Sequence, residues 1–168
     1  MKNRRARIFV IALHAILLVV VYIFQSMIFP YIRLWGLVPL ILPLVSTGTA
    51  VHGGRFAGAV SGLFAGIFTD LSFNQPLLLF TLILTLLGVG VGSMADTVFA
   101  KRFGTYFISC IIVLWVCALV QIFPLLVFGE VPAALLFDTA MWQTIYSLAF
   151  TVPIWFVIRK IVSISEES

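Results

Sequence analysis

Long apolar runs separated by short polar breaks occupy this chain from residue 8 onward. The breaks divide it into six apolar segments, at residues 8–28, 34–51, 56–70, 76–94, 104–128 and 137–162. A helix of about 20 apolar residues crosses the hydrocarbon core of a bilayer, which is roughly 30 Å thick. The pattern therefore predicts an all-α, polytopic membrane protein. We expect one integral membrane domain over residues 1–168, a compact bundle of six transmembrane helices.

Composition agrees with a membrane location. Hydrophobic residues make up 62% of the 168 residues and charged residues only 10%, whereas soluble domains carry about 25% charged residues. The basic residues before the first segment resemble the start of a secretory signal peptide. The apolar run that follows has 21 residues, longer than the roughly 7–15 of a signal peptide. We therefore expect this segment to remain as the first span.

Basic and aromatic residues predict the orientation of the six spans. If the N-terminus is cytoplasmic, nine of the ten Lys and Arg residues fall on the cytoplasmic side and only Arg33 falls outside. Cytoplasmic loops of membrane proteins carry this excess, and aromatic residues such as Trp155 mark the interfaces. Both termini are therefore expected in the cytoplasm. The net charge of +4 follows from this topology and calls for no nucleic-acid partner.

Small residues recur at every fourth position around the third segment. The series, which we call the glycine stripe, consists of Gly54, Gly58, Gly62 and Gly66, and Asp70 continues the same step. Residues four apart share one helix face, and glycine lets another backbone approach closely within lipid. The stripe is either an internal seam between helices or a groove that seats a partner helix or a ligand. The glycines at 88, 90 and 92 wrap around a helix and suggest local flexibility instead.

The third segment is also short for a membrane span. Its 15 residues reach only about 23 Å as a helix, against roughly 30 Å of hydrocarbon. A short helix with a glycine face is best surrounded by protein, so we expect it at the centre of the bundle.

Asp70 allows two interpretations. It meets headgroups and water or caps the turn at 71–74, or it is a buried acid with a partner, for which Arg33 is the natural candidate. Gln121 and Gln143 are expected to form hydrogen bonds between helices.

The sequence contains no constellation typical of an enzyme. His14 and His52 have no second histidine or carboxylate at ligand spacing, so a metal site is not expected. Cys110 and Cys117 lie about two helical turns apart, too far for a disulfide, and are expected to be packing residues. The Gly53–Gly54 turn lacks the Lys and Ser/Thr of a phosphate-binding loop. We therefore expect neither catalysis nor a cofactor.

Two stretches resemble a known family. Gly62-Leu-Phe-Ala-Gly66-Ile-Phe-Thr-Asp70 follows a segment with Pro39 and Pro43 and resembles the signature of the rod shape-determining protein MreD. The last segment contains Pro153-Ile-Trp-Phe-Val-Ile-Arg-Lys, which is similar to the C-terminal helix of that family. The Leu-Gly step that the family usually carries after the aspartate is Asn-Gln-Pro-Leu-Leu at 74–78 here.

The resemblance implies a non-enzymatic component of the bacterial cell-elongation (rod) complex in the cytoplasmic membrane, which supports cell shape and peptidoglycan synthesis. Its implied partners are MreC, RodA with its penicillin-binding transpeptidase, MreB and membrane lipids. The residues expected to serve helix packing and partner binding are Gly54, Gly58, Gly62, Gly66, Asp70 and Pro153.

A second function follows from the architecture of that family. MreD is similar to the substrate-binding subunits of energy-coupling-factor vitamin transporters, so a transporter subunit is the alternative. Those subunits usually carry an Ala-x-x-x-Ala dock in the first span, whereas Ala12 and Ala15 are three residues apart here.

Overall fold

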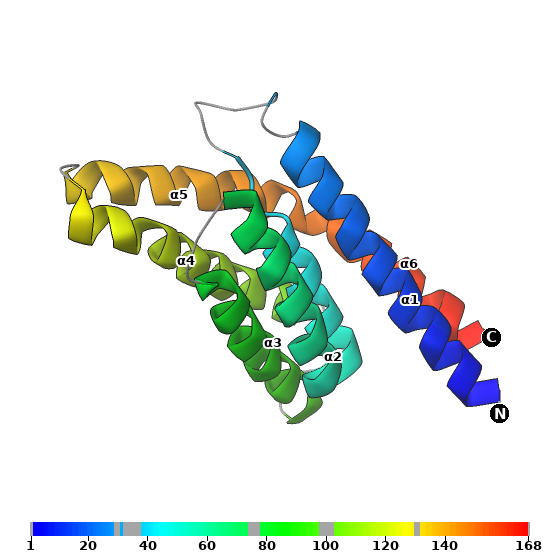
Figure 1. Ribbon diagram of the computed structural model, residues 1–168. Helices are drawn as coiled ribbons and strands as arrows, with labels where there is room; N and C mark the ends of the chain where they lie inside the picture. Colours follow the sequence, from blue (N-terminus) through cyan, green and yellow to red (C-terminus); the bar gives the residue numbers. More distant parts are fainter. Residues whose placement is uncertain are drawn as a thin grey trace.

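Helices account for nearly all of the residues that the computed structural model describes, which are 2–28, 31, 38–73, 78–97, 103–129 and 132–167 (Figure 1). The elements are α1 (Lys2–Ile23), a π-helical turn η1 (Phe24–Ile28), α2 (Leu42–Phe73), α3 (Leu79–Thr97), α4 (Phe103–Phe128), α5 (Ala133–Ala149) and α6 (Thr151–Glu167). No strand occurs within these ranges. The predicted all-α class is confirmed.

The segment labelled α2 is a hairpin of two helices. Gly54 breaks it with φ 76° and ψ −168°, a conformation that glycine adopts without the steric cost that a Cβ brings. The two halves run back along each other. A hydrogen bond at 3.4 Å from the hydroxyl of Ser61 to the carbonyl oxygen of Ser46 joins them. We call residues 42–53 α2a and residues 55–73 α2b. They correspond to the predicted segments 34–51 and 56–70, but the first helix begins only at Leu42, and residues 32–37 lie outside the described ranges.

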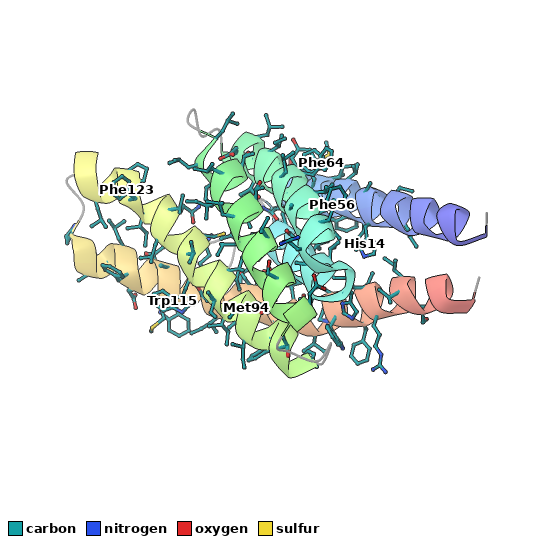
Figure 2. The ribbon with its side chains drawn as sticks, turned by 90° about the horizontal axis from the view of Figure 1, so that it is seen from below. His14, Phe56, Phe64, Met94, Trp115 and Phe123 are labelled. Atoms are coloured by element: carbon teal, nitrogen blue, oxygen red, sulfur yellow. The ribbon has the colours of Figure 1, made fainter. Side chains whose placement is uncertain are left out.

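The centre of the bundle is α2a. Every residue from Leu42 to Val51 is buried, whereas α2b exposes Phe56 at 80% and Phe64 at 48% of their surface (Figure 2). The expectation that the segment 56–70 lies at the centre is therefore wrong. A glycine face requires one close neighbour, and the opposite face of α2b carries large apolar side chains that point out of the bundle.

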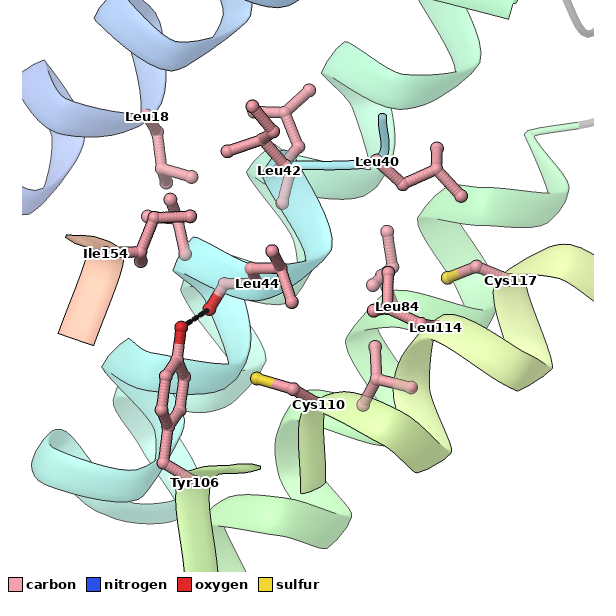
Figure 3. Close-up of a cluster of buried hydrophobic side chains, with 14 of the residues drawn as sticks. Leu18, Leu40, Leu42, Leu44, Leu84, Tyr106, Cys110, Leu114, Cys117 and Ile154 are labelled. Atoms are coloured by element: carbon pink, nitrogen blue, oxygen red, sulfur yellow. Dashed lines mark hydrogen bonds between the residues drawn. The ribbon is translucent and has the colours of Figure 1, made fainter. Parts of the chain in front are cut away.

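Side chains from five helices, α1, α2b, α3, α4 and α6, close around α2a. Figure 3 shows part of this main cluster of buried residues. The hydroxyl of Tyr106 donates to the carbonyl oxygen of Leu44 at 3.3 Å and ties α4 to α2a. Cys110 and Cys117 are free thiols within this cluster, where they pack as small apolar side chains. Trp155, expected at the membrane interface, is instead only 6% exposed and stacks on Tyr106 with ring centroids 5.1 Å apart.

The predicted last segment, 137–162, is bent. It corresponds to α5 and α6, whose axes differ by 41° across a break at Phe150. Pro153 is the third residue of α6; it has no N–H to donate, and its ring clashes with the carbonyl group four residues earlier. The break therefore lies where a proline is expected to interrupt a continuous helix.

Two helices are long and apolar enough to cross a membrane, at Leu79–Asp96 and Phe103–Pro124. The number rises to three if the bent α5–α6 pair is one span, and Leu13–Met27 is a shorter apolar helix; this holds for the described residues. These apolar helices fit a membrane protein, while the count of six spans stays a prediction. The start of α1 and the end of α6 lie at the same end of the molecule (Figure 1).

Candidate functional site

The glycine stripe of α2b lies against α3, and the contact between α2 and α3 is the most extensive between any two of the described helices. A Cβ added to Gly58 would meet the carbonyl oxygen of Gly88, and one added to Gly62 would meet the carbonyl oxygen of Leu84. At Gly66 the added atom would meet the Cα of Thr81. Backbone thus packs on backbone at three successive turns, which in a membrane supplies the van der Waals contact that holds helices together.

Two glycines of α3 complete the seam from the other side. A Cβ on Gly88 would meet the carbonyl oxygen of Gly58, and one on Gly92 would meet the backbone of Gly54 and Arg55. Only Gly90 points away, with no atom within 4 Å of an added Cβ. The interpretation of these glycines as a flexible patch is therefore wrong for 88 and 92. Their spacing of four is the same signal that marks the stripe on α2b.

Asp70 caps the N-terminus of α3. Its side chain is only 2% exposed, and its carboxylate accepts hydrogen bonds from the backbone N–H groups of Phe80 at 3.1 Å and Thr81 at 2.8 Å. The hydroxyl of Thr81 donates a third bond at 2.6 Å. The first N–H groups of a helix have no partner within the helix and carry partial positive charge, so a carboxylate satisfies both needs.

This geometry decides between the two interpretations of Asp70. Burial contradicts a side chain in contact with headgroups and water. The acid caps the next helix, not the turn at 71–74, and the residues 74–77 lie outside the described ranges. Arg33, the partner expected for a buried Asp70, also lies outside them.

Asp96 performs the same task at the opposite end of the pair. It lies in the last turn of α3, and its Oδ2 accepts the backbone N–H of Arg55 at 3.1 Å, at the first residue of α2b. The two antiparallel helices therefore cap each other, each with an aspartate near its C-terminal end. Sequence reasoning missed Asp96, although an acid near the end of each of two adjacent helices is a recognisable signal.

A second group of polar contacts holds residues 38–41, which precede α2a and belong to no helix. Gln25 accepts the backbone N–H groups of Ile41 and Leu42 through Oε1, each at 3.1 Å. From α5, Ser147 accepts the N–H of Leu40 at 2.9 Å. Side chains of η1 and α5 thus accept the backbone N–H groups that have no partner within a helix.

Neither of the two glutamines expected to link helices forms such a bond among the described residues, although Gln143 bonds to the segment that precedes α2a. Gln143 of α5 donates from Nε2 to the carbonyl oxygen of Val38 at 2.9 Å. Gln121 of α4 is half-buried and forms no hydrogen bond with the part of the chain that the structure describes. Gln25 was not singled out from the sequence, yet its side chain forms more hydrogen bonds with the described residues than that of Gln121 or Gln143.

The structure brings together five of the six predicted site residues. Gly54, Gly58, Gly62, Gly66 and Asp70 lie along the contact between α2b and α3. Pro153 is exposed in α6, and its role is the bend that follows α5. Among the described residues, no group of three or more His, Cys, Asp or Glu side chains could hold a metal ion.

A comparison with known protein families gives a match over nearly the whole chain. The family model for the rod shape-determining protein MreD matches residues 5–164. The chain belongs to the MreD family. No curated protein and no solved structure matches the chain.

In this member of the MreD family, the site consists of contacts that pack α2b against α3. Its parts are glycine backbones and two carboxylates that accept hydrogen bonds from N–H and O–H groups of the neighbouring helix. Such groups fix the distance and register of two helices. The family supports a role in rod-shape determination. A helix pair with a fixed distance and register is compatible with such a structural role.

Proposed function

We propose that this chain is a non-enzymatic component of the bacterial cell-elongation complex in the cytoplasmic membrane. In this proposal it binds MreC, and through MreC it joins RodA, the penicillin-binding transpeptidase and MreB. The family match supports a role in rod-shape determination. The observation that carries the rest is the α2b–α3 pair, closed by glycines along its length and by an aspartate at each end.

The glycine stripe supports partner binding through shape and not through direct contact. Because α3 covers the stripe, a partner helix finds no room there. The stripe instead fixes the outer face of α2b, where Phe56 and Phe64 point out of the bundle (Figure 2). A rigid pair presents its outer side chains in one arrangement, which lowers the entropic cost of binding. We propose that an outer face of this kind seats the single span of MreC.

Gly62→Leu tests the role of the stripe. The new side chain would meet the backbone of Leu84 and Thr85, so α2b and α3 must separate and co-purification with MreC should be lost. Gly90→Leu is the matched control, because it adds the same side chain to a membrane helix where no atom lies within 4 Å. A folded Gly62→Leu variant that retains MreC as well as Gly90→Leu does would refute the role of the stripe.

Gly62→Ala covers the case in which the leucine variant does not fold. A single methyl group still meets the carbonyl oxygen of Leu84, so a weaker but measurable loss of MreC is expected. Size-exclusion chromatography and circular dichroism separate a folded variant from an unfolded one. A vitamin that stays bound to the purified protein would favour the transporter subunit in place of the scaffold.

A further inference from the structure

The helical stretches that carry basic residues at the two ends of the sequence lie at the same end of the molecule. The helices α1 and α6 pack together, and the start of the first lies beside the end of the second (Figure 1). Six of the ten Lys and Arg residues of the chain belong to these two stretches, namely Lys2, Arg4, Arg5, Arg7, Arg159 and Lys160. Only two acidic residues, Glu166 and Glu167, accompany them.

The cations of α6 are available for an outside partner. Arg159 and Lys160 are both exposed, and neither forms an ion pair within the described ranges of the chain. The carboxylates of the nearby bundle are committed elsewhere, since Asp70 and Asp96 cap the helices of the α2b–α3 pair. The positive charge of Arg159 and Lys160 is therefore not neutralised by the carboxylates that the structure describes.

The exposed surface of α6 changes character just before these cations. Val152, Phe156 and Val157 expose 47%, 62% and 44% of their surface, which suits contact with lipid tails. Arg159 follows Phe156 by three residues, or about 5 Å along the helix. Headgroups are expected where exposed apolar side chains end, which would place the two cations at the level of lipid phosphates. In the sequence of α1, the same change occurs between Arg7 and Ile8.

We propose that this end of the α1–α6 pair binds the phosphate groups of anionic phospholipids. Clusters of Lys and Arg next to a membrane helix are attracted to anionic headgroups. The guanidinium group of Arg159 matches two phosphate oxygens at once, and the ammonium group of Lys160 adds a point charge. The contact would hold the two terminal helices on one leaflet, independently of any protein partner.

Native mass spectrometry of the purified full chain tests the site. The protein is equilibrated in micelles that contain equal amounts of phosphatidylglycerol and phosphatidylethanolamine, and the retained lipids are counted. We expect the wild type to retain more phosphatidylglycerol, and Arg159→Gln with Lys160→Gln to lower that retention by about twofold or more. Raising the salt concentration should weaken retention in the wild type as well, since salt screens exposed charges.

The matched control removes the same charge elsewhere. Lys101→Gln with Arg102→Gln deletes two cations from another stretch on the same predicted side, and it should leave phosphatidylglycerol retention unchanged. An equal loss in both double variants would overturn the proposal, because it would reflect net charge alone. The proposal would also be overturned if the wild type showed no preference for phosphatidylglycerol. Co-purification of an acidic protein that is lost in Arg159→Gln with Lys160→Gln would overturn it too.

The variants are expected to fold, because both replaced residues lie on the surface. Arg159 and Lys160 are exposed, so their replacement removes no buried contact, and circular dichroism verifies the helix content. Should the double variant fail to fold, Lys160→Gln alone gives the same comparison with one charge. Retention equal to that of the wild type in the folded variant contradicts the site.

Discussion

The carboxylate of Asp70 accepts two hydrogen bonds from Thr81, one from the backbone N–H at 2.8 Å and one from the hydroxyl at 2.6 Å. Thr81 is also the residue whose Cα lies against Gly66. One turn of α3 is thus fixed both by a helix cap and by the last glycine of the stripe. The cap sets the register of the two helices, and the glycine sets their distance.

Asp70→Ala should destabilise the folded protein by at least about 2 kcal/mol, because it leaves the buried N–H groups of Phe80 and Thr81 without an acceptor. Asp70→Asn keeps one acceptor oxygen and should recover part of the loss. Asp138→Ala is the control, since Asp138 is exposed on α5. Thermal unfolding in detergent checks the order; equal stability of the Asp70 and Asp138 variants would contradict the cap.

Gly54→Ala should cost about 1–3 kcal/mol, because Gly54 has φ 76° and ψ −168°, a conformation that residues with a Cβ essentially never adopt. The added Cβ would also meet the carboxylate of Asp96. Asp96→Ala removes that clash, so the double variant should lose less stability than the two single variants together. Additive losses in denaturation of the four proteins would show that strain at Gly54 is independent of Asp96.

Gln25→Ala should lower the free energy of unfolding by about 2 kcal/mol, because the N–H groups of Ile41 and Leu42 lose their shared acceptor. Gln121→Ala removes a glutamine of the same size that has no hydrogen bond with the described residues, and it should change stability by less than about 0.5 kcal/mol. The difference between the two variants in thermal unfolding measures the contribution of the cap. Equal losses would mean that Gln25 contributes packing alone.

The contact surface of α2b was predictable from sequence because its signal is local. Residues four apart share a helix face wherever the helix lies, so Gly58, Gly62 and Gly66 had to line one side. The turn at Gly54 is local as well, since it depends on the backbone freedom of one residue. The bend before Pro153 also has a local cause, but residues 137–162 were predicted as one span and the bend was missed.

The position of each helix in the bundle was not predictable in the same way. In a membrane protein both lipid and protein favour apolar side chains, so hydrophobicity does not separate an inside face from an outside one. Leu42 is fully buried and Phe56 is 80% exposed, although both are apolar. The partner of the stripe and the cap from Asp96 depend on which helix lies opposite, which no local pattern encodes.

The orientation of the chain gives the last prediction. Tyr31 is 90% exposed between α1 and α2, and Ser163 is exposed near the end of α6. If both termini are cytoplasmic, a membrane-impermeant maleimide should label Tyr31→Cys in intact cells and Ser163→Cys only after permeabilisation. Background labelling should be low, because Cys110 and Cys117 are buried. Labelling of both variants in intact cells would place these two positions on the same side and contradict a six-span arrangement with nine of ten Lys and Arg residues inside.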